Sequence, residues 1–182
     1  MGTVSHLKAG TDTAIGQRQI SEDIRKYTAM KKLNPEYVEA VATLVNQCPY
    51  FKLLSAELKS LGWGESHLEL EVQKKHFQPY GIVHGGVCAS ILDAAAFWAV
   101  HAGMEDMVGL TTVEIKINYL APVSKGRLIA KGRCIKAGKT IGLGDATIHD
   151  DKGRLVAHGT STLMVVDSME IQGQATLPPK FL

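Results

Sequence analysis

The sequence predicts an α+β fold in which an antiparallel sheet wraps around one long central helix. Residues 81–103 have helical character, and from Val87 to Val100 they are apolar almost all the way round. Shorter segments before and after this helix show the alternation of apolar and polar residues that is typical of strands. Because the helix has to be buried on every side and only the strands can cover it, we expect the sheet to enclose it.

The composition indicates a single globular domain with a substantial core, since 45% of the 182 residues are hydrophobic. The formal charge is only +2, and no run of Lys or Arg is interleaved with aromatic residues, which argues against a nucleic-acid partner. Three widely spaced cysteines favour reduced thiols in a cytoplasmic protein over disulfides or structural zinc. The seven histidines show no metal-ligand spacing, so we expect no metal.

The apolar run is also too short for a membrane span. It has fewer than the roughly 20 residues that cross a bilayer, and it contains Asp93. The N-terminal residues lack the apolar stretch of a signal peptide. A buried helix therefore accounts for the run better than a membrane helix, and no membrane partner is expected.

Residues 1–47 are predicted to form an N-terminal helical extension. Residues 1–17 are polar and expected to be loose, and helices are expected at 21–32 and 34–47. The second helix begins at Asn34, an N-cap residue followed by proline, and ends before the next Cys-Pro pair. Its apolar residues share one face, which consists of Val38, Val41, Ala42 and Val45.

Residues 48–167 are predicted to form the main domain, followed by a loose tail at 168–182. A hairpin is expected from strands 53–61 and 66–73, joined by Gly62-Trp63-Gly64. After the central helix, four strands are expected in a meander, at 111–119, 126–136, 140–149 and 154–166. The first of these strands has the alternation of a strand with one covered face, at Val113, Ile115, Ile117 and Tyr119.

Asp93 stands in the middle of the apolar helix, where a carboxylate without partners costs free energy. No Lys or Arg lies within a turn of Asp93 on either side, and Ser90 is its one polar neighbour at helical spacing. A structural role would require a fixed cation or several hydrogen-bond donors. We therefore interpret Asp93 as a functional residue of an active site.

Gly85 and Gly86 open the same helix, where free backbone N–H groups and the positive end of the helix dipole meet whatever lies in front. Taken alone, the two glycines also fit a tight turn into the helix. With His84 before them and Asp93 after them, we favour an oxyanion-binding site. Gly85 and Asp93 are eight residues apart, about 12 Å along a helix, so one reacting carbon cannot reach both in a single chain. This spacing predicts a homo-oligomer whose site is completed by a second copy.

Three stretches carry a resemblance to a known family: QPYGIVHGGVCASILDAAA, KINYLAP and KAGKTIGLGDATIHDDKGRLVAHGT. Over residues 48–166 the chain resembles the hotdog-fold acyl-CoA thioesterases, a 4-hydroxybenzoyl-CoA thioesterase-like superfamily, and within it the phenylacetate-degradation branch. The resemblance implies hydrolysis of an acyl-CoA substrate by a homodimer or a homotetramer built as a dimer of dimers. It implies no cofactor, because coenzyme A enters as part of the substrate.

In the mechanism that this resemblance implies, the Gly85 N–H stabilises the oxyanion, and Asp93 acts as general base on water or attacks as nucleophile. Thr112 would orient the water or the Asp93 carboxylate, although an ordinary strand threonine also fits this position. Gln78 would donate to the thioester carbonyl or position the water. Many relatives have Asn at this point, and the branch with Gln-Pro-aromatic-Gly tends to carry Glu in place of Asp, so this sequence combines two patterns. His84 either bonds the thioester oxygen or sulfur or braces the loop through the backbone.

Coenzyme A would bring phosphates to the site. Gly86 is expected to allow close approach of the ligand to the backbone, and Arg133, Lys136 and Lys139 are candidates for the phosphates, the alternative being a solvated basic strand end. Two other functions remain open: a non-catalytic acyl-CoA-binding protein, and a hotdog dehydratase or hydratase. The sequence leaves the acyl group undetermined, and with it whether the N-terminal helices restrict an acyl tunnel.

Overall fold

The structure is a computed structural model in which residues 32–182 are described. The expected loose end at 1–17 and almost all of the expected helix at 21–32 lie outside these residues. The described helices are α2 (Pro35–Gln47), α3 (Pro49–Leu54) and α4 (Gly85–Gly103), with short 3-10 turns at Lys74–His76 and Gln174–Thr176. The strands are β1 (Ala56–Gly62), β2 (Glu65–Glu71), β3 (Gly109–Tyr119), β4 (Arg127–Ala137), β5 (Ile141–Asp150) and β6 (Leu155–Val166).

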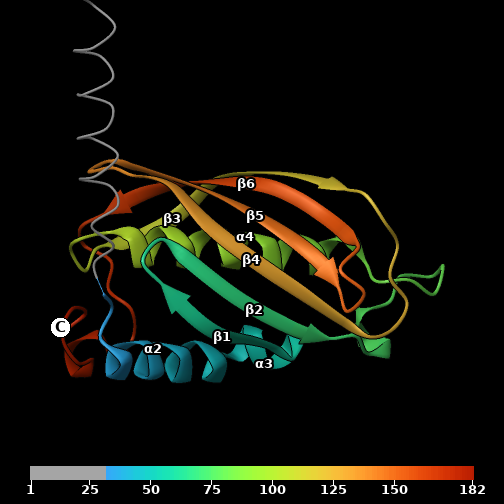
Figure 1. Ribbon diagram of the computed structural model, residues 1–182, viewed down its shortest axis with the longest axis horizontal. Coiled ribbons are helices and arrows are strands. Elements are labelled where there is room, and N and C mark those ends of the chain that lie inside the picture. The colour runs from blue at the N-terminus through green and yellow to red at the C-terminus, as the bar shows by residue number, and fades with distance from the viewer. Residues whose placement is uncertain (1–31) are drawn as a thin grey trace, which may run out of the picture. The chain divides into compact units, whose positions relative to one another are not determined.

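All strand pairs are antiparallel, and the strands form one sheet in the order β1-β2-β4-β5-β6-β3 (Figure 1). The sheet lies over one side of α4, with α2 and α3 beside β1 (Figure 1). The predicted fold class is therefore confirmed. The predicted four-strand meander is wrong, because β3 pairs with β6 and β2 pairs with β4. After α4 the chain enters β3 at one edge of the sheet, and the segment after β3 leads to β4, which pairs with β2 near the other edge.

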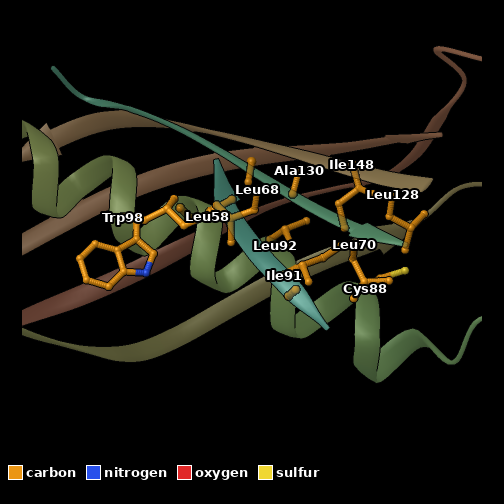
Figure 2. Close-up of a cluster of buried hydrophobic side chains, with 14 of the residues drawn as sticks. Leu58, Leu68, Leu70, Cys88, Ile91, Leu92, Trp98, Leu128, Ala130 and Ile148 are labelled. Carbon is orange, nitrogen blue, oxygen red and sulfur yellow. The ribbon is translucent and has the colours of Figure 1, made fainter. Parts of the chain in front are cut away.

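Helix α4 is buried by close approach of the strands to its backbone. Ala95, Ala96 and Ala99 have no exposed surface, and a Cβ at Gly132 of β4 would overlap the carbonyl oxygen of Ala95. Larger apolar side chains fill the space between helix and sheet on both sides of this contact, among them Leu58, Leu68, Leu70, Ile91, Leu92, Leu128 and Ile148 (Figure 2). Small residues on α4 and glycines on the strands thus let the sheet curve around the helix.

By length and hydropathy alone, α4 is the one helix in the described part of the chain that could cross a membrane, with 61% of the tested window buried inside the fold. Its apolar surface is used in the core of the domain, as Figure 2 shows for Ile91 and Leu92. The same composition that would suit a lipid environment is here explained by burial under the sheet.

The start of the first strand differs from the prediction. Leu53 and Leu54 belong to α3, and β1 begins at Ala56. Pro49 provides the first residue of a helical turn, and Ser55 ends that turn with a left-handed backbone at φ 54°. The predicted stop of α2 at Cys48 is confirmed, and the proline that follows it begins the next helix.

Helix α2 covers the free edge of the sheet. The Asn46 side chain donates to the Leu58 carbonyl at 3.1 Å and accepts from the Leu58 N–H at 2.7 Å, so it pairs with β1 as a neighbouring strand would. Tyr37, Val41 and Val45 of α2 are buried, so the apolar face predicted for this helix packs against the rest of the domain. An edge protected in this way does not invite pairing with another chain.

The C-terminal tail, expected to be loose, is packed against the domain. Lys180 is only 6% exposed, and its Nζ donates to the carbonyl oxygens of His101 at 2.7 Å and Met104 at 2.6 Å. The Lys180 carbonyl accepts from the Asn34 N–H at 2.9 Å, which joins the tail to the start of α2. The expectation failed because the partners of the tail are distant in sequence, and a cation at a helix C-terminus is stabilising.

Strand β3 is the opposite edge of the sheet, and its predicted covered face is covered only in part. Val113 is 54% and Tyr119 55% exposed, and the register shifts between Thr112 and Glu114. Among the described strands, β3 pairs only with β6. Of the four residues of the predicted face, Ile117 packs against the core and the ring of Tyr119 lies against Gly85 of α4. The alternation was correctly identified as a strand, but the described part of the chain leaves Val113 exposed.

Candidate active site

The carboxylate of Asp93 is held by two hydroxyl groups on the neighbouring strands. Thr112 Oγ1 of β3 lies 3.0 Å from Oδ1 and 3.3 Å from Oδ2, and Ser161 Oγ of β6 donates to Oδ1 at 2.7 Å. Hydrogen bonds to an ionised carboxylate are short and strong, so the pair fixes the orientation of the side chain. The second oxygen, Oδ2, has only the longer contact with Thr112.

The predicted neighbourhood of Asp93 was incomplete. Thr112 stands where the resemblance placed it, beside the carboxylate, while Ser161 was missed. A signal for Ser161 exists in the alternation of β6, where Ala157, Ser161 and Leu163 all have inward, fully buried positions. A hydroxyl in a row of buried apolar residues requires a polar partner, and Asp93 is that partner.

At the N-terminus of α4, His84 is the N-cap residue. Its ring Nδ1 accepts from the Gly86 N–H at 2.8 Å, and the backbone N–H of His84 donates to the His76 carbonyl at 2.8 Å. The bracing role that was one alternative for His84 is thus present in the geometry. Because Nδ1 accepts, a neutral imidazole carries its proton on Nε2, which leaves one donor on an exposed side chain.

The two glycines at the helix start therefore differ. The N–H of Gly86 is used by His84, whereas no hydrogen bond of the Gly85 N–H is found among residues 32–182. The ring of Tyr119 lies against Gly85, since a Cβ there would be 3.1 Å from Cζ of that ring. Glycine at this position lets both Tyr119 and a ligand approach the helix N-terminus.

Gly85 opens into a pocket of about 360 Å³, which we call the N-terminal pocket. Gln78 lines it from the turn before α4, where Gly81 has φ 73°, and Cys88 lies on the α4 side. Burial raises the pKa of Cys88 to about 11, so its sulfur is a packed thiol and not a nucleophilic thiolate. Gln78 and Gly85 are thus brought together, as predicted, and Asp93 does not line this pocket.

Asp93 lines a second pocket of about 360 Å³ between α3 and α4, which we call the α3–α4 pocket. Its other walls include Tyr50 and Phe51 of α3 and Phe97 and Trp98 of α4. Gly85 and Asp93 therefore line separate pockets of one chain, as their spacing along the helix predicted.

The basic candidates lie at the other end of α4. Arg133 donates to Asp145 through Nε at 3.1 Å and Nη2 at 2.8 Å, a cross-strand ion pair between β4 and β5. A Cβ at Gly103, the last residue of α4, would be 3.1 Å from the sulfur of Cys134 beside Arg133. The helix is 19 residues long, so this end is about 27 Å from Gly85. Within one chain, Arg133, Lys136 and Lys139 are not part of the N-terminal pocket.

Comparison with known proteins identifies the class. Residues 80–157 match the family described as Thioesterase superfamily. A candidate esterase of Saccharolobus solfataricus is 31% identical over 128 residues, which cover 70% of this chain and 85% of that protein. The 1,4-dihydroxy-2-naphthoyl-CoA hydrolase of Listeria monocytogenes is 29% identical over 112 residues, 62% of this chain and 91% of its own.

Among solved structures, thioesterase HI1161 from Haemophilus influenzae superposes with a TM-score of 0.68 at 23% identity, covering 78% of this chain and 96% of that protein. The fold is thus the hotdog fold. The chain belongs to the thioesterase superfamily, and it is a thioester hydrolase.

Proposed function

We propose that this protein hydrolyses acyl-CoA thioesters with Asp93 as the reacting carboxylate. The observation that carries the proposal is the Asp93 carboxylate itself, oriented by Thr112 and Ser161 and facing a pocket. A carboxylate that served only the core would not need a hollow beside it. The relative from Listeria monocytogenes, named as a CoA hydrolase, supports a CoA thioester as the substrate.

In the general-base form of the reaction, Asp93 removes a proton from water as the water oxygen bonds to the thioester carbon. The carbonyl oxygen becomes an oxyanion and accepts from the Gly85 N–H at the positive end of a helix. The carbon–sulfur bond then breaks, and the coenzyme A thiolate takes up the proton, which leaves a free acid and a thiol. In the nucleophilic form, Asp93 attacks the carbon and the carbon–sulfur bond breaks, which releases coenzyme A thiolate and leaves an anhydride. Water then cleaves the anhydride to the free acid and the Asp93 carboxylate, and the thiolate takes up the proton that the water loses.

The same reaction requires two copies of the chain. Gly85 and Asp93 of one helix are too far apart for a single thioester, so the oxyanion donor of one copy has to face the carboxylate of another. The exposed residues Val113 and Ile115 of β3, beside Thr112, support a two-fold pairing along this edge, in a dimer or a dimer of dimers. If two α4 helices pack antiparallel, Lys136 and Lys139 of one copy come near the N-terminal pocket of the other.

The test is release of free CoA thiol from a panel of acyl-CoAs by the wild type and by Asp93→Asn. We expect kcat to fall by about 10²–10⁴-fold in the variant, because the amide neither accepts the proton nor attacks. Asp106→Asn, at an exposed carboxylate in the loop after α4, is the matched control and should keep wild-type activity. Tight binding of acyl-CoA without turnover by the wild type would instead support the non-catalytic binding protein.

A further inference from the structure

Tyr119, the last residue of β3, brings a hydroxyl group to the start of α4. Its ring lies against Gly85, because a Cβ at that glycine would be 3.1 Å from Cζ and 3.4 Å from the hydroxyl oxygen of Tyr119. Both residues line the N-terminal pocket. The hydroxyl is therefore beside the N–H group to which the proposed reaction assigns the oxyanion.

We propose that the Tyr119 hydroxyl is a second oxyanion donor, which hydrogen-bonds to the thioester oxygen together with the Gly85 N–H and stabilises its negative charge in the transition state. The proposal rests on the proposed function, because it adds a catalytic residue to the same hydrolysis. Donors that are in place where negative charge develops make one of the largest contributions to catalysis. The phenol keeps its proton throughout, so the balance of atoms and charges in the proposed reaction is unchanged.

The two donors are close enough to share one acceptor. Covalent geometry places a Cβ about 2.5 Å from the N atom of its own residue, so the Tyr119 hydroxyl oxygen lies no more than about 6 Å from the Gly85 N atom. An oxygen that accepts from both groups at about 2.9 Å allows them to be separated by up to about 6 Å. One oxyanion can therefore accept both hydrogen bonds. Because both donors belong to one chain, their pairing does not depend on how two copies are arranged.

The backbone fixes the position of Tyr119. Its partner across the sheet is Ala157 of β6, and the N–H of the next residue, Leu120, donates to the Val156 carbonyl at 2.8 Å. Ile117, two residues earlier and therefore on the same face of β3, packs against the core. The strand thus directs the Tyr119 ring towards α4, and an oxyanion donor has to be held in place in this way before the reaction begins.

The hydroxyl of Tyr119 is available to a ligand. It makes no hydrogen bond within the part of the chain that the structure describes, and the residue is 55% exposed. A hydroxyl hydrogen rotates about its C–O bond, so it can turn towards an acceptor in the pocket. The ring contact with Gly85 does not require this group, since phenylalanine would make the contact equally well. The hydroxyl is therefore the part of the side chain that packing does not explain.

Tyr119→Phe tests the proposal, because it removes the hydroxyl and keeps the ring against Gly85. We expect kcat for acyl-CoA hydrolysis to fall by about 10–100-fold and KM to stay within about twofold, since the hydrogen bond is stronger in the transition state than with the bound substrate. Tyr80→Phe is the matched control, because Tyr80 is 87% exposed and does not line the N-terminal pocket. It should keep wild-type kinetics. An unchanged kcat in Tyr119→Phe, or equal losses in the two variants, would overturn the proposal.

A spectroscopic measurement separates this proposal from the proposed function. The probes are ketone analogues of hexanoyl-CoA and benzoyl-CoA, in which a methylene group replaces the thioester sulfur and the carbonyl carbon carries a carbon-13 label. Because hydrogen bonds to the carbonyl oxygen move this NMR resonance downfield, we expect a downfield shift on binding to the wild type and to Tyr80→Phe, and a smaller shift in Tyr119→Phe. Equal shifts in the wild type and Tyr119→Phe would contradict the role of the hydroxyl. A smaller shift in Tyr119→Phe without any turnover by the wild type would contradict only the hydrolase mechanism.

Discussion

The two ends of α4 differ in how their backbone groups are hydrogen-bonded. At the C-terminal end, the carbonyls of His101 and Met104 accept from the buried ammonium of Lys180, and the tail covers them. At the N-terminal end, His84 caps one amide, and the Gly85 N–H faces a pocket. Both ends of any helix carry unpaired backbone groups.

The difference separates an end of α4 that is closed within the chain from an end that the proposed reaction would use. The end that is closed within the chain contributes to the free energy of unfolding, because burial of unpaired carbonyls would be costly. The end that remains open keeps an N–H group and the positive dipole available for a developing negative charge. Changes at the open end should therefore affect the reaction, and changes at the closed end should affect folding.

Of the changes at the two ends of α4, the largest effect is expected at the open end, from Gly85→Pro. Proline is tolerated at the first position of a helix, and His84 has ψ 137°, which a residue before proline readily adopts. The substitution removes the N–H, so we expect kcat for acyl-CoA hydrolysis to fall by about 10²–10³-fold. Steady-state kinetics measures the effect, and urea unfolding should show little change.

Gly85→Ala is the control for this variant, because it places a Cβ against the Tyr119 ring but retains the N–H. Smaller losses in Gly85→Ala than in Gly85→Pro would identify the N–H as the important group. If both variants lose the same activity, contact with Tyr119 and not the hydrogen bond is responsible.

At the closed end, Lys180→Met should reduce stability and leave activity nearly unchanged. Methionine keeps the apolar stem but cannot donate to the His101 and Met104 carbonyls. We expect the free energy of unfolding to fall by about 3 kcal/mol, measured by urea denaturation at neutral pH. Lys152→Met, at an exposed turn, should have no such effect. A large loss of kcat in a folded Lys180→Met protein would contradict the division between the two ends.

A smaller, pH-dependent effect is expected from His101, also at the closed end. Burial, with a contribution from the charge of Lys180, lowers the pKa of His101 from 6.5 to about 3. Neither ring nitrogen has a partner among the described residues, so the folded protein keeps this side chain neutral. Below pH 6.5 the unfolded chain binds a proton that the folded chain does not.

Stability should therefore fall with decreasing pH, by up to about 1.4 kcal/mol per pH unit from this group, until the folded-state pKa is reached. In His101→Phe, which preserves an aromatic ring beside Phe97 and Trp98, this part of the pH dependence should disappear. Urea unfolding at several pH values between 7 and 4 measures the slope. Equal slopes in the wild type and His101→Phe would show that other groups control acid stability.

Local patterns predicted most of the elements. The N-cap at Asn34, the stop at Cys48 and the apolar run in α4 each depend on residues within a few positions, and all three were correct. The edge strand β3 was recognised, but its predicted covered face is covered only in part: Ile117 packs against the core, whereas Val113 is exposed. Alternation identifies an apolar face and does not identify the segment that packs against it.

The residues of the candidate site show the same difference between local features and long-range contacts. Gln78, Gly85 and Asp93 stood out in the sequence because a turn, a helix start and a carboxylate in an apolar helix are local features. Ser161 did not, since it meets Asp93 only after the chain has passed through 68 further positions. The assignment of catalytic roles to these residues stays a prediction.

The sequence by itself determined that a long apolar helix would be enclosed by an antiparallel sheet and that one carboxylate in it required an explanation. Only the tertiary structure decided the strand order, the hydroxyl partner Ser161, the α3 wall of the pocket and the Lys180 cap, whose partners lie 76 and 79 positions away. The physical reason is the distance along the sequence between the residues that interact. Helix caps and alternation depend on neighbouring residues, whereas these contacts depend on which distant segments pack together when apolar surface is buried.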